Sequence, residues 1–425
     1  MSIFAIALLS LTTLAAPAPN PAAEPAPAPA GEAGATLVEP AASPANPSSQ
    51  PAAWSIDWRL FAGAGAISGL GTRVDSGGLL LVDGALTPAW NSGRLEVALP
   101  LRLASRITPG ASLPETRARA AVEPVWKATP ILEMGAELGV GNTWRLGWED
   151  QYQRTAAGVM SPTDRYSYLA WLAGARLYLQ PWAHQHLRLR YRFEDVSYVR
   201  DPAFDPAKPQ HLTPRDQIQH ELNLSWRYVR RSYAVALRLQ TAFRRDSVYL
   251  ARRAGTGGSS GNPFQELNDF EPSLEVEWRR LLRGALDLSA RLGYEIQQDL
   301  FQGYYSYTGL HPRVQADWTV RPGLTAAASV EAWRRLYGPN SKAATEDLAR
   351  LYAHRLRVAG ELAYQLRSNL WLRGEASWLT NDTNYPDYVP GVYPVPPRAP
   401  DGYYDIKQDY DNLRAVIGVE WRSSR

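Results

Sequence analysis

From residue 54 onward the chain repeats one pattern, in which apolar and polar residues alternate over about ten positions. One clear instance has Leu187, Leu189, Tyr191 and Phe193 in alternation with three arginines and Glu194. Strict alternation predicts a β-strand with one apolar face and one polar face. A tilted strand needs about ten residues to cross a bilayer, whereas strands of soluble sandwiches have about five or six. The pattern therefore favours strands that cross a membrane.

The two faces continue from one predicted strand to the next along the whole region. The charged face must meet water, and the apolar face must meet lipid, because no helical segments are available to cover it. In lipid every backbone group has to be paired within the protein, and only a closed sheet achieves this without a free edge. The sequence thus predicts an all-β fold, namely a transmembrane antiparallel up-and-down β-barrel of about 16 strands.

The connections between predicted strands alternate between short and long. Short ones include residues 91–93, 229–231, 321–323 and 367–369, and the longest covers residues 380–407. In such barrels the short turns are periplasmic and the long loops are extracellular, so an even strand number places both termini in the periplasm. We expect strands at 54–66, 78–90, 93–103, 116–127, 130–148, 166–180, 186–196, 217–228, 232–244, 269–279, 284–297, 310–320, 323–334, 354–366, 369–379 and 408–421.

Composition excludes several other classes of protein. The mean hydropathy is −0.33, and no stretch after residue 16 approaches the length of apolar chain that a membrane-spanning helix needs. The absence of cysteine excludes disulfides, thiolate metal sites and a cysteine nucleophile. The net charge is only +3, without a dominant basic run, so nothing supports binding to nucleic acid.

The first 53 residues differ from the rest. Residues 1–16 are expected to form a signal peptide, with an apolar core from Ile3 to Leu14 and small residues around Ala16, although no basic residue precedes the core. Residues 17–53 are mostly Ala, Pro, Ser, Glu and Gly, which predicts a disordered periplasmic tether. The barrel is expected to occupy residues 54–425.

A second regularity concerns tryptophan. Six predicted strands end, just before a short turn, with a tryptophan in the phase of the apolar face. Such a set predicts an aromatic girdle at the periplasmic membrane interface. The six residues are Trp90, Trp126, Trp226, Trp278, Trp318 and Trp421.

In these features residues 54–425 resemble the outer-membrane porin-like barrels of Gram-negative bacteria. The last strand, Asn412 to Trp421, is similar to the C-terminal signal that the barrel-assembly machinery reads, although four residues follow Trp421 here. The resemblance implies a location in the outer membrane, contact with its lipid, and insertion by that machinery. It is a resemblance of architecture and implies no particular solute.

The polar face is rich in both arginine and acidic residues. Opposed ladders of the two would create a transverse field across a pore and select polar solutes. Alternatively, the charges pair across strands and only solvate the wall. The strip of Arg188, Arg190 and Arg192 is the sharpest feature, because three like charges repel unless an acid such as Glu221 or an anionic solute faces them. The residues expected to line a channel are Arg117, Arg119, Arg188, Arg190, Arg192, Glu221, Arg238, Glu275, Glu277, Arg355, Arg357 and Arg373.

Three functions fit this sequence. The first is an outer-membrane channel that passes hydrophilic solutes through a charged lumen. The second is an export porin for a secreted polysaccharide, and the third is an outer-membrane anchor of an envelope-spanning complex, both with periplasmic partners that bind residues 17–53. We expect no enzymatic activity, no cofactor and no metal, since no serine or paired acid is linked by spacing to the histidines. His184 and His186 have a spacing that could share a metal ion, but no further ligand is evident.

Overall fold

The computed structural model describes residues 53–71, 77–108, 112–145, 147–148, 162–163, 167–198, 217–251, 261–303, 306–337, 352–383 and 410–423. The predicted signal peptide and almost all of the predicted tether lie outside these residues, as does most of the longest predicted loop. None of the helices in the described part is long and apolar enough to span a membrane.

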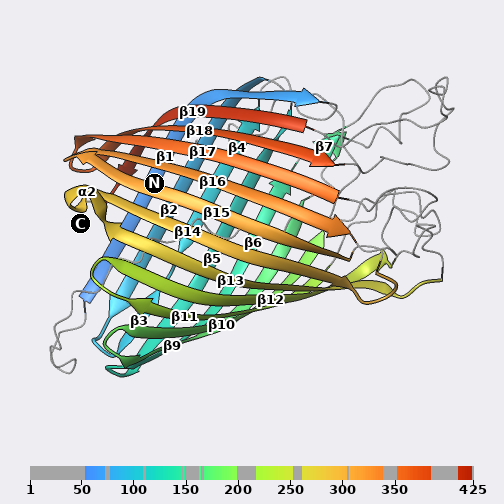
Figure 1. Ribbon diagram of the computed structural model, residues 1–425, viewed down its shortest axis with the longest axis horizontal. Helices are drawn as coiled ribbons and strands as arrows, with labels where there is room; N and C mark the ends of the chain where they lie inside the picture. Colours follow the sequence, from blue (N-terminus) through green and yellow to red (C-terminus); the bar gives the residue numbers. More distant parts are fainter. Residues whose placement is uncertain are drawn as a thin grey trace.

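The described strands form one closed antiparallel sheet, in which β1 pairs with both β2 and β19 (Figure 1). The sheet has 17 segments, but β3 and β4 are two parts of one strand, so the barrel has 16 strands. This confirms the predicted fold class. The segments are β1 Ala53–Gly71, β2 Gly77–Asn91, β3 Leu95–Ala98, β4 Leu101–Thr108, β5 Ser112–Thr129, β6 Leu132–Arg145, β9 Tyr168–Trp182, β10 Gln185–Tyr198, β11 Gln217–Val229, β12 Tyr233–Leu250, β13 Phe264–Arg280, β14 Leu286–Asp299, β15 Tyr307–Arg321, β16 Leu324–Tyr337, β17 Tyr352–Arg367, β18 Leu370–Thr383 and β19 Tyr410–Arg422.

Several predicted boundaries were wrong in detail. The predicted strand 93–103 is divided at Leu99 and Pro100, because proline has no N–H for the ladder, and its second part continues to Thr108. Strand 130–148 ends at Arg145, and Gly147–Trp148 forms β7, which pairs with β8, Pro162–Thr163, inside a predicted loop. The turn around Leu281 contains a short helix, α2, Leu281–Gly284. The strands β12 and β13 extend well into the predicted loop 245–268.

One face of the wall carries exposed, large apolar side chains, among them Leu138, Trp171 and Ile417, which are 64%, 57% and 60% exposed. On the other face, side chains from strands two apart contact one another, as Arg227 of β11 and Glu277 of β13 do. Side chains two strands apart converge only on the concave side of a closed sheet. The charged face therefore lines the lumen, and the apolar face is the outer surface.

The short connections lie together at one end of the barrel, where α2 is found in Figure 1. We call this end the turn end. Strand β1 starts there and β19 finishes there, because Trp54 pairs with Trp90 beside the first turn and Arg59 pairs with Arg422. After Trp421 the chain continues this pairing, since the N–H of Ser423 donates to the carbonyl of Trp58 at 2.9 Å.

Candidate functional site

The candidate site is the charged wall of the lumen. All twelve residues expected to line a channel lie on this face, according to the strand registers. Whether they act on a passing solute stays a prediction. They come from five parts of the barrel: Arg117 and Arg119 from β5; Arg188, Arg190 and Arg192 from β10; Glu221 from β11; Arg238, Glu275 and Glu277 from β12 and β13; Arg355, Arg357 and Arg373 from β17 and β18.

Glu137 of β6 is the main counter-charge of the arginine strip on β10. It accepts hydrogen bonds from Arg119 and from Arg190, the latter at 3.1 Å. Its side chain is 10% exposed, so the two guanidinium groups almost cover it. The role of Glu137 in neutralising the strip was not predicted from the sequence.

The remaining two arginines of the strip have different surroundings. Arg192 pairs with Glu194 of its own strand at 3.2 Å. Glu221 lies opposite Arg192 in the strand register, but its side chain accepts a hydrogen bond from Asn223 at 2.6 Å. The guanidinium of Arg188 lies over the ring of Tyr178, 5.4 Å from its centre, and no ion pair within the described residues includes Arg188. Arg188 is therefore the member of the strip that is most available to an anion.

A second set of ion pairs connects β11, β12 and β13. Arg227 binds Glu277 at 2.6 Å and passes over β12, whose Ala234 and Ala236 are 1% and 3% exposed beneath it. Arg238 binds Glu275 at 2.5 Å. Small residues on the middle strand let long side chains lie flat along the wall instead of projecting into the lumen.

His311 of β15 is at the centre of a third cluster, which sequence reasoning missed. Its Nε2 is 2.8 Å from Glu331, and its Nδ1 is 3.2 Å from Glu271 and 3.5 Å from Glu295. Its ring stacks on Trp333 with centres 4.8 Å apart. The acids come from three other strands, so no spacing in the sequence links them to His311. The only available signal was that all of them share the phase of the polar face.

Glu271, Glu295 and His311 offer ligand atoms within 4.8 Å of one another, which makes them the candidate metal ligands of the described residues. However, each carboxylate already has a cationic partner. Arg291 binds Glu271 at 2.7 Å, and Arg335 binds Glu295 at 2.9 Å. The cluster is thus balanced by the chain's own cations, and we assign it to the structure of the wall.

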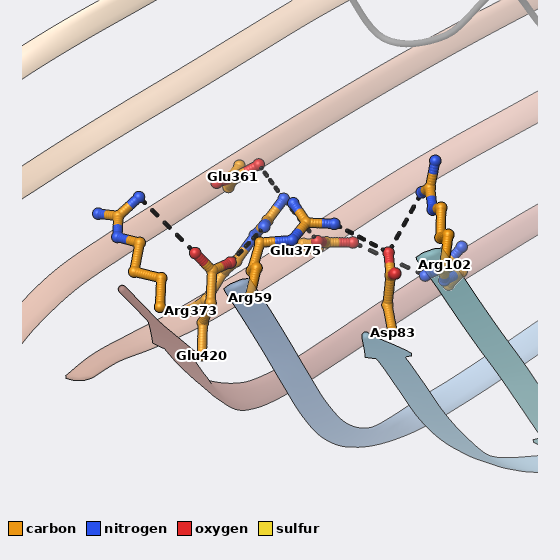
Figure 2. Close-up of polar contacts among 9 residues, drawn as sticks. Arg59, Asp83, Arg102, Glu361, Arg373, Glu375 and Glu420 are labelled. Carbon is orange, nitrogen blue, oxygen red and sulfur yellow. Dashed lines mark hydrogen bonds and ion pairs between the residues drawn. The ribbon is translucent and has the colours of Figure 1, made fainter. Parts of the chain in front are cut away.

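A fourth cluster lies where β1 and β19 close the barrel (Figure 2). Arg373 of β18 binds Glu361 of β17 at 2.8 Å, Glu375 of its own strand at 3.0 Å and Glu420 of β19 at 2.7 Å. Beside it, Asp83 accepts from Arg59 at 3.0 Å and from Arg102 at 3.3 Å (Figure 2). Ion pairs therefore connect β17, β18 and β19 on one side of the closure and β1, β2 and β4 on the other.

Charge is distributed unevenly around the lumen. Arginines outnumber acids on β9 to β12, whereas acids outnumber arginines on β13 and β14. The inward arginines of the first arc are Arg176, Arg188, Arg190, Arg192, Arg227, Arg238 and Arg244, and the inward acids of the second are Asp269, Glu271, Glu275, Glu277, Asp287, Glu295 and Asp299. Many of these charges pair across strands while the two arcs keep opposite signs, and an effect of the arcs on solutes stays a prediction.

The six tryptophans expected to form a girdle all lie on the outer face and towards the turn end. Trp126, Trp278, Trp318 and Trp421 are 49%, 43%, 45% and 38% exposed, while Trp226 donates from Nε1 to Gln185 at 3.2 Å. Trp90 directly precedes the end of β2. Their contact with a membrane interface stays a prediction.

His184 and His186 point to opposite sides of the wall. The ring of His184 meets the edge of Tyr228, which is on the outer face, at 6.3 Å. His186 belongs to β10 rather than to the turn, and it stacks on Tyr178 on the lumen face. Two histidines on opposite faces cannot share one metal ion, so this spacing has no metal-binding meaning here.

The class that this fold defines is the 16-stranded antiparallel β-barrel, and solved structures with a similar course are outer-membrane porins. They include OccAB1 of Acinetobacter baumannii, with 9% identity and a TM-score of 0.45 over 86% of this chain and 96% of the other. They also include an anion-selective porin of Comamonas acidovorans, with 13% identity and a TM-score of 0.39 over 87% of this chain and 100% of the other. A third is OprB of Pseudomonas putida, with 9% identity and a TM-score of 0.45 over 87% of this chain and 94% of the other. These likenesses are too distant to support any argument about the solute. Models of known protein families give no match, and neither do curated protein sequences.

Proposed function

We propose that this protein is an outer-membrane channel that passes small hydrophilic solutes through the charged lumen. The observation that carries the proposal is the separation of the two faces of one closed sheet. The outer face exposes large apolar side chains, which water disfavours and lipid accepts, while the inner face carries arginines and acids that require water or partners.

The geometry of the lumen charges supports passage of solutes. Long side chains lie along the wall over small residues, as Arg227 does over Ala236, so they take little of the cross-section. A 16-stranded barrel is wide enough for an aqueous channel when its lumen is not filled. The basic arc on β9 to β12 and the acidic arc on β13 and β14 would orient a polar solute between them.

The test is the conductance of the full-length protein, refolded and inserted into a planar bilayer. We expect steady current steps that grow with salt concentration. The matched control is Arg188→Gln, which leaves the barrel intact and should change the ratio of anion to cation permeability without abolishing the steps. A folded barrel that inserts but never conducts would contradict the proposal.

The export and anchor alternatives depend on partners of residues 17–53, which lie outside the described residues except for Ala53. They stay predictions. Removal of residues 17–53 distinguishes them from a simple channel, because only an exporter or an anchor needs this segment for its partners. Unchanged conductance of the shortened protein together with loss of a cellular phenotype would favour one of these alternatives.

A further inference from the structure

The turn end of the barrel is rich in arginines, and the connections found there contain no acidic residue. Seven connections lie there, from the last residue of one strand to the first residue of the next. Together they contain seven arginines and no aspartate or glutamate. The arginines are Arg94, Arg230, Arg231, Arg280, Arg283, Arg321 and Arg367.

The surroundings of these arginines contrast with those of the lumen. Six of them, all except Arg283, have described side chains, and all six are exposed. Within the described part of the chain none of the six forms an ion pair, whereas Arg119, Arg190, Arg227 and Arg373 of the lumen all do. The turn end thus presents exposed positive charge that no ion pair within the described residues neutralises.

For two of these arginines, contacts with tyrosines show on which side of the barrel wall the side chain lies. The guanidinium of Arg230 lies over the ring of Tyr228, 5.2 Å from its centre, and its Nε donates to the hydroxyl of the same residue. Arg321 lies 5.8 Å from the ring centre of Tyr364. Both tyrosines belong to the outer face, because each has even phase on a strand whose odd residues face the lumen. These two arginines therefore lie on the outer surface and not at the pore mouth.

The neighbourhood of Tyr228 matches a membrane interface. Its ring stacks on Trp226, one of the six girdle tryptophans, with centres 6.5 Å apart, and it also contacts Tyr233 at 6.3 Å. Aromatic side chains of this kind collect at the level of lipid headgroups. A guanidinium group presents a planar fork of donors that fits two oxygens of a phosphate.

From these observations we infer that the arginines of the turn end form a binding surface for the phosphate of anionic phospholipids in the adjacent leaflet. Arg230 and Arg321 are its best-defined part, and the exposed Arg231 follows Arg230 in the same β11–β12 turn. This inference rests on the proposed location of the barrel in a membrane. It concerns the lipid that surrounds the barrel and is independent of any solute in the lumen.

The test compares how two spin-labelled lipids, phosphatidylglycerol and phosphatidylcholine, associate with the full chain in phosphatidylcholine bilayers. The motionally restricted fraction of each lipid is measured by electron spin resonance. For the native chain at low salt we expect a preference for phosphatidylglycerol of about fivefold, which decreases as salt is added. The triple variant Arg230→Gln, Arg231→Gln, Arg321→Gln should lose most of this preference.

A lumen variant that loses the same net charge is the matched control. The triple variant Arg188→Gln, Arg238→Gln, Arg313→Gln should keep the lipid preference of the native chain; Arg313 lies on the lumen face of β15, opposite Glu331. Equal association of both lipids with the native chain, or a preference that persists in the Arg230, Arg231 and Arg321 variant, would overturn the inference. Loss of the preference on addition of millimolar inorganic phosphate would identify a soluble phosphate as the ligand and would also overturn it. Failure of the native barrel to insert would contradict the proposed membrane location itself.

Discussion

Arg190 of β10 reaches Glu137 of β6 at 3.1 Å, although β9 lies between their two strands. The residue of β9 opposite Glu137 is Gly174, which leaves the space above the middle strand open. The same relationship recurs elsewhere in the lumen. Arg335 passes over Gly309 to reach Glu295, and Glu271 lies over Gly293 to reach His311. A small residue on the middle strand, glycine in these cases and alanine beneath Arg227, therefore allows charged groups two strands apart to meet.

The first prediction concerns Gly174. A Cβ atom there would lie 3.0 Å from the carbonyl oxygen of Tyr191 and 3.5 Å from the carboxylate of Glu137. Gly174→Leu should displace the bridge and lower the free energy of unfolding by about 2 kcal/mol. The measurement is urea unfolding in lipid vesicles, in which the folded fraction is determined from the different gel mobility of the folded barrel. The cost should shrink when Glu137→Gln is already present, and an equal cost in both backgrounds would show that the bridge is not involved.

A second prediction concerns ion selectivity. Glu137→Gln removes the shared partner of Arg119 and Arg190, so the ratio of anion to cation permeability should rise by about two- to fivefold. Arg188→Gln should lower the same ratio. The reversal potential across a bilayer under a salt gradient gives the ratio directly. If neither variant moved the reversal potential, the lumen face around β10 would not be in contact with the permeating ions.

His311 gives a third prediction, on stability. His311→Phe keeps a flat ring against Trp333 but removes both nitrogens from Glu271, Glu295 and Glu331. It should lower the free energy of unfolding by roughly 1–3 kcal/mol, because the half-buried carboxylate of Glu331 loses the donor that His311 supplies, while Glu271 and Glu295 keep only their arginine partners. Glu331→Gln in the His311→Phe background should cost less than it does alone. Additive effects of the two substitutions would mean that His311 and Glu331 contribute separately.

The fourth prediction tests the contact between β1 and β19. At Gly418 a Cβ atom would lie 2.4 Å from the carbonyl oxygen of Ala62 and 2.7 Å from the ring of Phe61. Gly418→Ala should therefore shift the backbone of the closing strands and lower the urea midpoint, at a cost of roughly 2 kcal/mol. Gly374→Ala is the control, since a Cβ atom there meets nothing within 4 Å. Equal midpoints for the two variants would contradict the close approach of β1 to β19.

Much of the barrel could be predicted because alternation is a local property. The face of each strand follows from its own residues, as at Leu187 and Arg188, and short turns such as 321–323 mark the ends. The break at Pro100 could also have been expected from the missing N–H of proline. The β7–β8 pairing could not, because two-residue strands carry no periodic signal.

The partners within the lumen were harder to predict. Glu221 was expected to face the arginine strip because it lies on the adjacent strand, and Arg192 does pair with it in register. Arg192 nevertheless pairs with Glu194, and Arg190 pairs with Glu137. Strand tilt and the space over Gly174 determine which of these groups can meet. Tilt and space depend on how the whole sheet closes, and neither can be read from one strand. For the same reason no spacing predicted the three acids around His311.

The bridges over glycine also have a consequence for how the strands align during assembly. Because side chains alternate between faces, a slip of one residue in β9 would turn Gly174 outward and bring large residues such as Trp171 into the lumen. The contact between Arg190 and Glu137 would then be blocked, although neither residue belongs to the strand that slipped. Each such bridge therefore disfavours misalignment of the middle strand, although that strand contributes only a glycine to the contact. The bridge thus favours the correct register of three adjacent strands at once.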